Sequence, residues 1–364
     1  MNPEICVTAP LRIDPACGMM DAPPLNEGGT DITNFGITVF SDLGRRSRQL
    51  GLTVELTDGS QIVFTRNGTR GNLADTNNKS MLLPRSIIHS YLEQYPRCSG
   101  LVFRVDDNLP TRTGLGGSGS LSVALHVGIE HALARKRGEK YTPDPNVLLQ
   151  RAHNLEVNEL GITGGFQDFV AAFFGKLNHI DFSRLSETNL TTHPTLGTQM
   201  ETGIKGYFDS HLLILLRRDR NIPSSTVMED VIERYGTNPS SARARFREII
   251  SYNRRMFDLL STSGPLSNRL EEIGEIMNNA WELHRSLSSL IGGKDLSDWE
   301  RLVKPYVYGV GGPGTGANSL VLLTREEGNK QIEKALHPYR DTVEILSAHV
   351  SETGVNVSVP TPDY

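Results

Sequence analysis

The chain has 364 residues, with hydrophobic side chains at 37% of positions and a formal net charge of −5. This composition is typical of a globular protein with room for two domains of roughly 150 residues each, and its negative charge predicts no binding of nucleic acid. We expect no signal peptide and no membrane span, because no apolar run approaches about 20 residues. Three cysteines without metal-ligand spacing indicate a reducing cytoplasm.

A strand is predicted over residues 5–13, interrupted by Pro10. Arg12 lies among apolar neighbours, where a charged group has to be paired or lie at a surface. A salt bridge on an edge strand is the simplest interpretation of this segment taken alone. The loop over residues 16–29 contains too much proline and glycine for regular structure. It carries Asp21, which is a candidate substrate contact.

Residues 52–65 alternate apolar and polar side chains around an Asp58-Gly59 pair, which predicts a β-hairpin. A helix is predicted over residues 84–95, and a strand over residues 101–105. This mixture of hairpins and helices, without regular alternation of strand and helix, predicts an α+β fold.

Three glycines occur within four residues, at Gly114, Gly116 and Gly117, shortly before a helix predicted over residues 121–134. A glycine turn that opens a helix is a ready anion site, because its free N–H groups converge and the helix dipole adds about half a positive charge. The alternative is a connection without a ligand. The turn is not a Walker P-loop, since no Gly-Lys-Ser/Thr follows. It is not a dinucleotide fingerprint either, since a polar loop separates it from the preceding strand.

A further helix is predicted over residues 146–160, with Glu156 near its C-terminal end, where the helix dipole disfavours a carboxylate. A glycine turn over residues 161–167 leads to Asp168, at the start of a short apolar helix. Asp168 is either an N-terminal cap or a carboxylate beside buried aromatic residues, an environment in which a base would be tuned.

The threonine-rich segment 183–206 is the predicted crossing between two domains. Three regular elements are predicted after it: a buried strand over 212–216 and helices over 240–262 and 266–290. The basic and hydroxyl side chains of residues 217–226 face either an anionic ligand or solvent, and solvent is the simpler interpretation. A second glycine loop at 308–316 leads into a strand, and a glycine loop in each half indicates a cleft between domains.

Several segments, in order along nearly the whole chain, resemble motifs of the GHMP kinase superfamily, which includes galactokinase, homoserine kinase and mevalonate kinase. Residues 9–13 are similar to its first motif, residues 110–120 to its phosphate loop, usually written P-x-x-x-G-L-G-S-S-A, and residues 309–316 to its glycine-rich third motif. The closest similarity is to D-glycero-D-manno-heptose 7-phosphate kinases and fucose-kinase-like sugar kinases, and residues 164–175, 21–24 and 276–288 carry it.

This resemblance implies Mg²⁺-assisted phosphoryl transfer from ATP to a hydroxyl of a sugar or of a sugar phosphate such as a heptose 7-phosphate. The anomeric C1 hydroxyl is the expected acceptor. The implied fold has a ribosomal protein S5 domain 2-like, ATP-binding domain over residues 1–200 and a ferredoxin-like domain over residues 201–364. The expected protein is a cytoplasmic monomer or homodimer with a small-molecule substrate and without nucleic-acid or membrane partners.

The same resemblance assigns roles to individual residues. Asp168 would be the catalytic base, assisted by Arg12, and Ser118 with Glu156 would bind Mg²⁺. The nucleotide would be held by Pro110, Gly114, Leu115, Gly116, Gly117, Ser118, Gly119 and Ser120, and the acceptor by Asp21, Gly165, Gln167, Gly311 and Gly312.

The chain also departs from the family pattern. Gly117 replaces the first serine of the phosphate loop, and residues 16–21 replace a G-G-G-T-D segment, which brings two methionines near the acceptor. Two alternatives therefore stay open: a kinase of a non-sugar alcohol, such as a mevalonate-like acid, and a non-catalytic member that binds nucleotide or sugar. The cations that could hold a phosphate on the acceptor, unless they are ordinary surface charges, are Lys79, Arg85, Arg217, Arg218 and Arg220.

Overall fold

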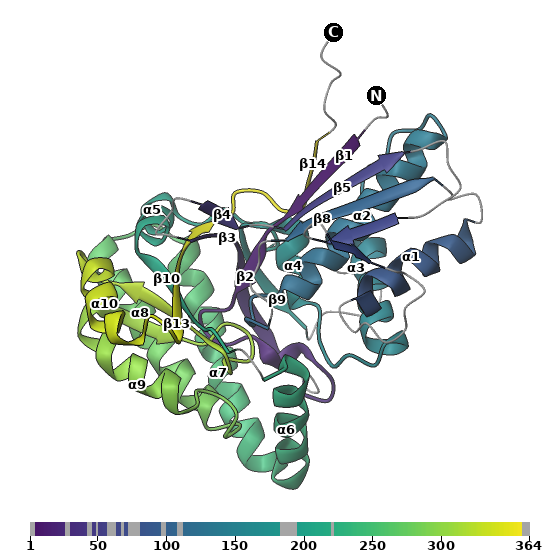
Figure 1. The fold of residues 1–364 in the computed structure, drawn as a ribbon. Coiled ribbons are helices and arrows are strands. Elements are labelled where there is room, and N and C mark those ends of the chain that lie inside the picture. The colour runs from purple at the N-terminus through teal and green to yellow at the C-terminus, as the bar shows by residue number, and fades with distance from the viewer. Residues whose placement is uncertain are drawn as a thin grey trace.

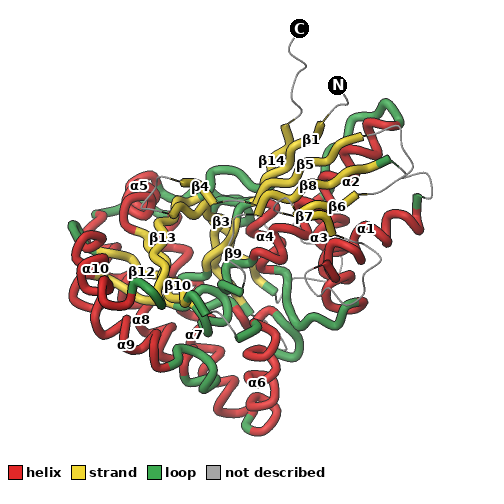
Figure 2. Tube along the Cα trace, in the orientation of Figure 1, coloured by secondary structure: helices red, strands yellow, loops and turns green. Residues whose placement is uncertain are grey.

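A computed structural model describes residues 4–25, 30–41, 46–48, 50–56, 63–66, 69–71, 81–95, 100–107, 112–182, 195–219 and 222–358. Helices and strands are mixed and the strands form two sheets, so the predicted α+β class is confirmed (Figures 1 and 2). Within the described residues, none of the helices combines the length and the apolar character needed to cross a membrane.

The first sheet has six strands in the order β14-β1-β5-β8-β6-β7. Their bounds are β1 Glu4–Ala9, β5 Leu50–Leu56, β6 Val63–Arg66, β7 Thr69–Gly71, β8 Leu101–Asp107 and β14 Asn356–Ser358. Neighbouring strands are antiparallel, except that β6 and β8 are parallel. Four helices belong to this half: α1 Leu82–Gln94, α2 Gly117–Lys136, α3 Pro145–His153 and α4 Gln167–Phe174. Helix α2 packs directly on β1 and β5, and α1, α3 and α4 pack around α2.

The second sheet runs β11-β12-β10-β13-β3-β2, with β4 and β9 also paired to β3, and is antiparallel throughout. Its strands are β2 Leu11–Ile13, β3 Asp31–Ser41, β4 Arg46–Arg48, β9 Leu177–Asp181, β10 Leu212–Arg217, β11 Val307–Gly311, β12 Ser319–Thr324 and β13 Val343–Val350. The remaining helices are α5 Thr202–His211, α6 Ser224–Thr237, α7 Pro239–Ser261, α8 Leu266–Arg285, α9 Lys294–Val303 and α10 Gly328–Leu336. Helices α8, α9 and α10 lie on the side away from the first sheet (Figure 1).

The chain passes between the two sheets at Pro10. Proline has no N–H to donate to a strand ladder, so β1 ends there and β2 begins one residue later in the other sheet. This break was predicted from the sequence. The crossing places Arg12 at the edge of the second sheet, facing the helices of the first half.

The predicted hairpin over residues 52–65 is wrong. Strands β5 and β6 both form, but β8 lies between them and pairs with each, so the two are not neighbours in the sheet. The Asp58-Gly59 pair lies outside the described residues. Alternation shows only that a strand has one buried face, whereas the identity of its neighbour is decided by packing with distant segments.

Two other expectations are refined by the structure. The helix predicted over residues 146–160 is α3 followed by a π-helical turn, Asn154–Glu159, which contains Glu156. The glycine segment 308–316 begins as strand β11 and becomes a loop only after Gly311. The predicted domain boundary at residue 200 stays a prediction, and we note that β3 and β13 pair across it.

Asn253 of α7 joins the second half to the loop that carries Asp21. Its side chain is fully buried, accepts the N–H of Thr33 at 2.7 Å, and donates to the carbonyl oxygens of Ala16 and Cys17 at 3.0 Å each. The carbonyl groups of Ala16 and Cys17 lie in a loop, and the Asn253 amide supplies the hydrogen bonds that a helix or sheet would otherwise provide.

We predict that Asn253→Ala lowers the free energy of unfolding by about 3 kcal/mol, because it leaves several buried polar groups without partners. Urea denaturation followed by circular dichroism measures this. The matched control is Ser251→Ala on the same helix, whose exposed hydroxyl bonds only to Glu248; we expect a change within about 0.5 kcal/mol. Equal effects of the two substitutions would contradict the role given to Asn253.

Candidate active site

Arg12 is the centre of the candidate site. It is 95% buried, with 5% of its surface exposed, and its guanidinium donates from Nε to Asp168 Oδ1 and from Nη1 to Asp14 Oδ2. Burial by itself lowers the pKa of Arg12, but the charges of Asp14 and Asp168 outweigh it and raise the pKa, so the guanidinium stays charged. The predicted salt bridge on an edge strand therefore exists, and it also reaches a predicted catalytic residue.

Asp14 connects Arg12 to the second glycine loop. Its carboxylate accepts the guanidinium and also the backbone N–H of Gly314. Burial raises the pKa of Asp14 to about 6, although Arg12 opposes this shift. The sequence places Asp14 among apolar residues but assigns it no role, because its partner Gly314 is 300 residues away along the chain.

The first glycine turn packs closely against Arg12. Gly114 and Gly116 have φ angles of 76° and 72°, in the left-handed region that favours glycine. A Cβ at Gly116 would lie 2.8 Å from Arg12 Cγ. The carbonyl of Leu115 also accepts the Arg12 N–H at 2.9 Å. The turn and β2 therefore hold each other in place.

Glycines 117 and 119, both in the first turn of α2, have different functions. A Cβ at Gly119 would lie 2.6 Å from Asp168 Cβ, so this glycine allows α2 to pack against the start of α4. At Gly117 the nearest atom to a Cβ is 4.0 Å away, and the residue lines the pocket. The next residue along α2 after Gly119, Ser120, is buried and donates to the carbonyl of Pro10 at 2.6 Å.

Ser118 and Glu156 form the predicted metal pair. Ser118 is the second residue of α2, and its hydroxyl donates to Glu156 Oε1 at 3.4 Å. Burial raises the pKa of Glu156 to about 8, with the charge of Asp168 adding to the shift and Ser118 opposing it. The described part of the chain has no group of three or more His, Cys, Asp or Glu that could hold a metal. Two oxygens nevertheless fit Mg²⁺, which commonly takes one or two protein oxygens and completes its shell with phosphates and water.

Asp21 is held by the start of α4. Gln167 donates its backbone N–H to Asp21 Oδ2 at 2.9 Å and its side-chain amide to Oδ1 at 3.2 Å. The carbonyl of Gln167 accepts from Asn34 at 3.0 Å, so the arrangement is anchored in β3. A Cβ at Gly165 would lie 2.0 Å from Asp21 Cγ, which explains the glycine there. Burial raises the pKa of Asp21 to about 7, helped by Asp168 and Asp14 and opposed by Gln167 and Arg12.

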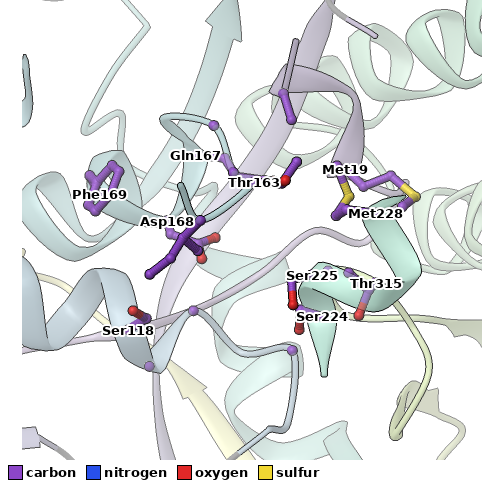
Figure 3. A pocket seen from close by; sticks show the side chains of 18 of the residues that line it. Met19, Ser118, Thr163, Gln167, Asp168, Phe169, Ser224, Ser225, Met228 and Thr315 are labelled. Carbon is purple, nitrogen blue, oxygen red and sulfur yellow. The ribbon is translucent and has the colours of Figure 1, made fainter. Parts of the chain in front are cut away.

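These groups surround a pocket of about 420 Å³, whose lining comes from both halves of the chain (Figure 3). The lining includes nine of the residues predicted from the sequence: Arg12, Asp21, Gly114, Gly116, Gly117, Ser118, Gly165, Gln167 and Asp168. Asp168 has 30% of its side chain exposed, so it is the member of the Arg12 cluster that a ligand can reach.

The other predicted residues do not line this pocket. Glu156, Leu115, Gly119 and Ser120 are buried beside or behind it, and Pro110 lies outside the described residues. Gly311 and Gly312 pack behind the second glycine loop, where a Cβ at Gly312 would lie 2.3 Å from the Trp281 ring. That loop presents Gly314 and Thr315 to the pocket instead.

Some residues that line the pocket were not predicted from the sequence as site residues. Ser224 and Ser225, at the start of α6, line the pocket, so of the two alternatives left open for this segment they are placed where a ligand could reach them. Arg112 and Thr315 line it as well, and neither was singled out. Both could have been identified from the sequence, because Arg112 lies inside the phosphate-loop motif and Thr315 inside the third glycine motif.

Of the cations predicted to hold a phosphate, the three that the structure describes, Arg85, Arg217 and Arg218, do not line the pocket. Arg217 pairs with Asp219 at 2.6 Å and with Asp295 at 3.4 Å, and Arg218 is exposed. Neither they nor Arg85 line the pocket, and Lys79 and Arg220 lie outside the described residues.

Comparison with known proteins confirms the predicted resemblance. Residues 83–176 match the family model for the GHMP kinases N terminal domain. Over 355 residues the chain is 22% identical to a bifunctional fucokinase/GDP-fucose pyrophosphorylase of Arabidopsis thaliana, an alignment that covers 92% of this chain and 31% of that protein. The chain thus spans about a third of the length of this relative.

Solved structures show the same fold over the whole chain. A D-glycero-D-manno-heptose 1-phosphate kinase from Bacteroides thetaiotaomicron superposes with a TM-score of 0.69 at 16% identity, covering 98% of this chain and 99% of that one. The Methanococcus jannaschii mevalonate kinase superposes with a TM-score of 0.67 at 14% identity, covering 95% of this chain and 98% of that one. A sugar kinase and a mevalonate kinase match equally well, so the fold does not identify the acceptor.

We predict that Asp21 makes stability fall as the pH rises. Its pKa is about 7 in the folded chain and about 4 in an unfolded one. Between these values the folded state holds the proton that the unfolded state has released, so ionising the buried carboxyl costs stability. Asp21→Asn removes this cost, and the amide of Gln167 can turn to accept the new N–H.

Thermal melts at pH 5 and pH 8 test the sign. The melting temperature of Asp21→Asn, measured relative to the parent protein, should be higher at pH 8 than at pH 5. Asp341→Asn, at an exposed position, should show no such difference. If the melting temperature of Asp21→Asn relative to the parent falls as the pH rises, the fold stabilises the ionised carboxylate, and the prediction is wrong.

Proposed function

We propose that this chain, whose residues 83–176 match the family model for the GHMP kinases N terminal domain, transfers the γ-phosphoryl group of ATP to a hydroxyl of a sugar or sugar phosphate, the anomeric C1 hydroxyl being the expected acceptor. The observation that carries the proposal is the position of Asp168. This carboxylate faces the pocket, is fixed by a buried arginine, and lies beside the first turn of α2, where Ser118 and Glu156 meet.

The nucleotide phosphates would lie against the first turn of α2. Gly117 begins this helix, and its N-terminus has no side-chain cap. The backbone N–H groups of the turn are therefore available to phosphate oxygens, and the left-handed glycines allow close approach. Ser118 and Glu156 would hold Mg²⁺, which neutralises charge on the transferring group when bound.

Asp168 would hold the acceptor hydroxyl. Its Oδ1 is occupied by Arg12 Nε, which leaves Oδ2 to accept the hydroxyl hydrogen. As the acceptor oxygen forms its bond to the γ-phosphorus, the bond to the bridging oxygen of ADP breaks, and the proton passes to Asp168 Oδ2. Such reactions depend mainly on positioning and charge neutralisation, so the role of Arg12 is to hold this carboxylate in a fixed orientation. Asp21 would accept a second hydroxyl of the sugar.

A coupled ADP-release assay over sugars, sugar phosphates and mevalonate-type hydroxy acids distinguishes three candidate functions: a sugar kinase, a kinase of a non-sugar alcohol, and a non-catalytic binding protein. ADP release with a sugar or sugar phosphate supports the proposal. Release only with a hydroxy acid supports the non-sugar kinase. Tight ATP binding without release for any acceptor identifies a non-catalytic binding protein.

We predict that Asp168→Asn lowers kcat by about 10²- to 10⁴-fold, the usual contribution of a positioned base, while KM for ATP changes by less than about threefold. Steady-state kinetics with the best acceptor of the panel measures both constants. Circular dichroism of the variant checks that the fold is intact. Full activity in a folded Asp168→Asn protein would remove the base assignment.

We also predict that Glu156→Gln raises the Mg²⁺ concentration needed for half-maximal activity by about tenfold or more, because it removes a charged oxygen ligand. Glu159→Gln is the matched control: it removes the same charge from the same π-helical turn at an exposed position. The control should titrate with Mg²⁺ like the parent. Identical curves for the two variants would show that Glu156 does not bind the metal.

A further inference from the structure

One wall of the pocket, formed mainly by the second half of the chain together with Arg112, has no role in the proposed transfer. Four of its residues are of interest: Arg112, which ends the loop before the first glycine turn, Ser224 and Ser225 of α6, and Thr315 of the second glycine loop. Figure 3 shows Ser224, Ser225 and Thr315 together on one side of the pocket, away from Ser118.

Arg112 is a cation without an internal partner. It is exposed, and the described residues give its side chain neither an ion pair nor a hydrogen bond. The lining contains one other arginine, Arg12, which is committed to Asp14 and Asp168. Arg112 therefore supplies the uncompensated positive charge of this wall.

Thr315 points to a polar ligand. Its side chain is 91% buried, with 9% exposed, and it lines the pocket. No hydrogen bond to its hydroxyl is formed by any residue that the structure describes. A hydroxyl that lines the pocket and forms no bond within the described residues can donate to, or accept from, a polar ligand.

The start of α6 adds donors to the same place. This helix has 14 residues, begins at Ser224, and has no side-chain cap, so its first N–H groups and the two serine hydroxyls are available to an anion. The Asn318 amide fixes its position relative to Arg112, donating to the carbonyl of Arg112 at 3.0 Å and to that of Ile222 at 2.7 Å. One side chain thus holds the two segments of the wall in register.

We propose that Arg112, Ser224, Ser225 and Thr315 bind a phosphate group carried by the acceptor, which makes the substrate a phosphorylated sugar. This inference rests on the proposed function. The nucleotide has its own anion site at the start of α2, on the side of Ser118, whereas Ser224, Ser225 and Thr315 lie across the pocket from it (Figure 3), and Asn318 ties Arg112 to their side through Ile222. The acceptor, bound at Asp168 and Asp21, lies between the two sites and is the molecule whose far end reaches this wall.

The first test measures binding of inorganic phosphate by calorimetry to protein saturated with Mg²⁺ and a non-hydrolysable ATP analogue. Phosphate should still bind, and Arg112→Gln should weaken its affinity by about tenfold or more, because a charge-assisted hydrogen bond is lost. Arg112→Gly should have the same effect without backbone strain, since Arg112 has a φ of 57°, and Arg112→Lys should lose less. Arg247→Gln, at an exposed position on α7 away from the pocket, should bind phosphate like the parent.

Loss of phosphate binding on saturation with the analogue would place the anion in the nucleotide site and overturn the proposal. Equal affinity for phosphate in the parent protein, Arg112→Gln and Arg112→Gly would also overturn the proposal.

The second test compares sugar phosphates with the matching free sugars as acceptors. Arg112→Gln should lower the ratio of kcat/KM for the phosphorylated over the free sugar by about tenfold or more, while Arg247→Gln leaves this ratio unchanged. A rise in KM for ATP with an unchanged ratio would overturn the assignment to the acceptor. If no sugar is phosphorylated at all, the proposed function fails, and the calorimetric result alone decides whether this wall binds phosphate.

Discussion

The ion pair between Arg12 and its two aspartates is the constraint on which the site depends. A buried guanidinium costs much free energy unless it is paired and hydrogen-bonded, and here both partners are carboxylates from different parts of the chain. Asp168 is 156 residues away in sequence, and Asp14 in turn accepts the N–H of Gly314. Because Arg12 touches the first glycine turn, the start of α4 and, through Asp14, the second glycine loop, these segments are positioned relative to one another by one charge.

Besides this ion pair, side-chain amides hold the loops around the pocket in place. The loops around the pocket have no ladder, yet their buried N–H and carbonyl groups need partners. Asn34, Asn253 and Asn318 supply them, each bridging segments far apart in sequence, and Asn278 does the same for β11 by bonding to Tyr308 and Val310. An amide both donates and accepts and carries no charge. These bridges therefore contain no group that titrates, unlike the carboxyl groups of Asp14, Asp21 and Glu156, whose pKa values burial raises.

Local patterns predicted much of this molecule. The break at Pro10, the glycine turn before α2, and Asp168 at the start of α4 follow from residue chemistry within a few positions, and all three are present. The neighbour of β5 was not predictable, because strand pairing is decided by the packing of distant segments. The same limit explains Arg112 and Thr315. Each is an ordinary residue of its own motif, and only the fold shows that the charge of Arg112 and the hydroxyl of Thr315 line the same pocket.

The pairing of β14 with β1 has a consequence for how the chain reaches its native state. The first strand of the first sheet obtains its outer partner from residues 356–358, and β3 obtains β13 only from residues 343–350. During synthesis, both edges stay open until these later residues have been made. Contacts of such high sequence separation slow folding and leave strand edges able to pair with other chains in the meantime. Each sheet therefore needs a strand from late in the chain to cover an edge of a strand made early.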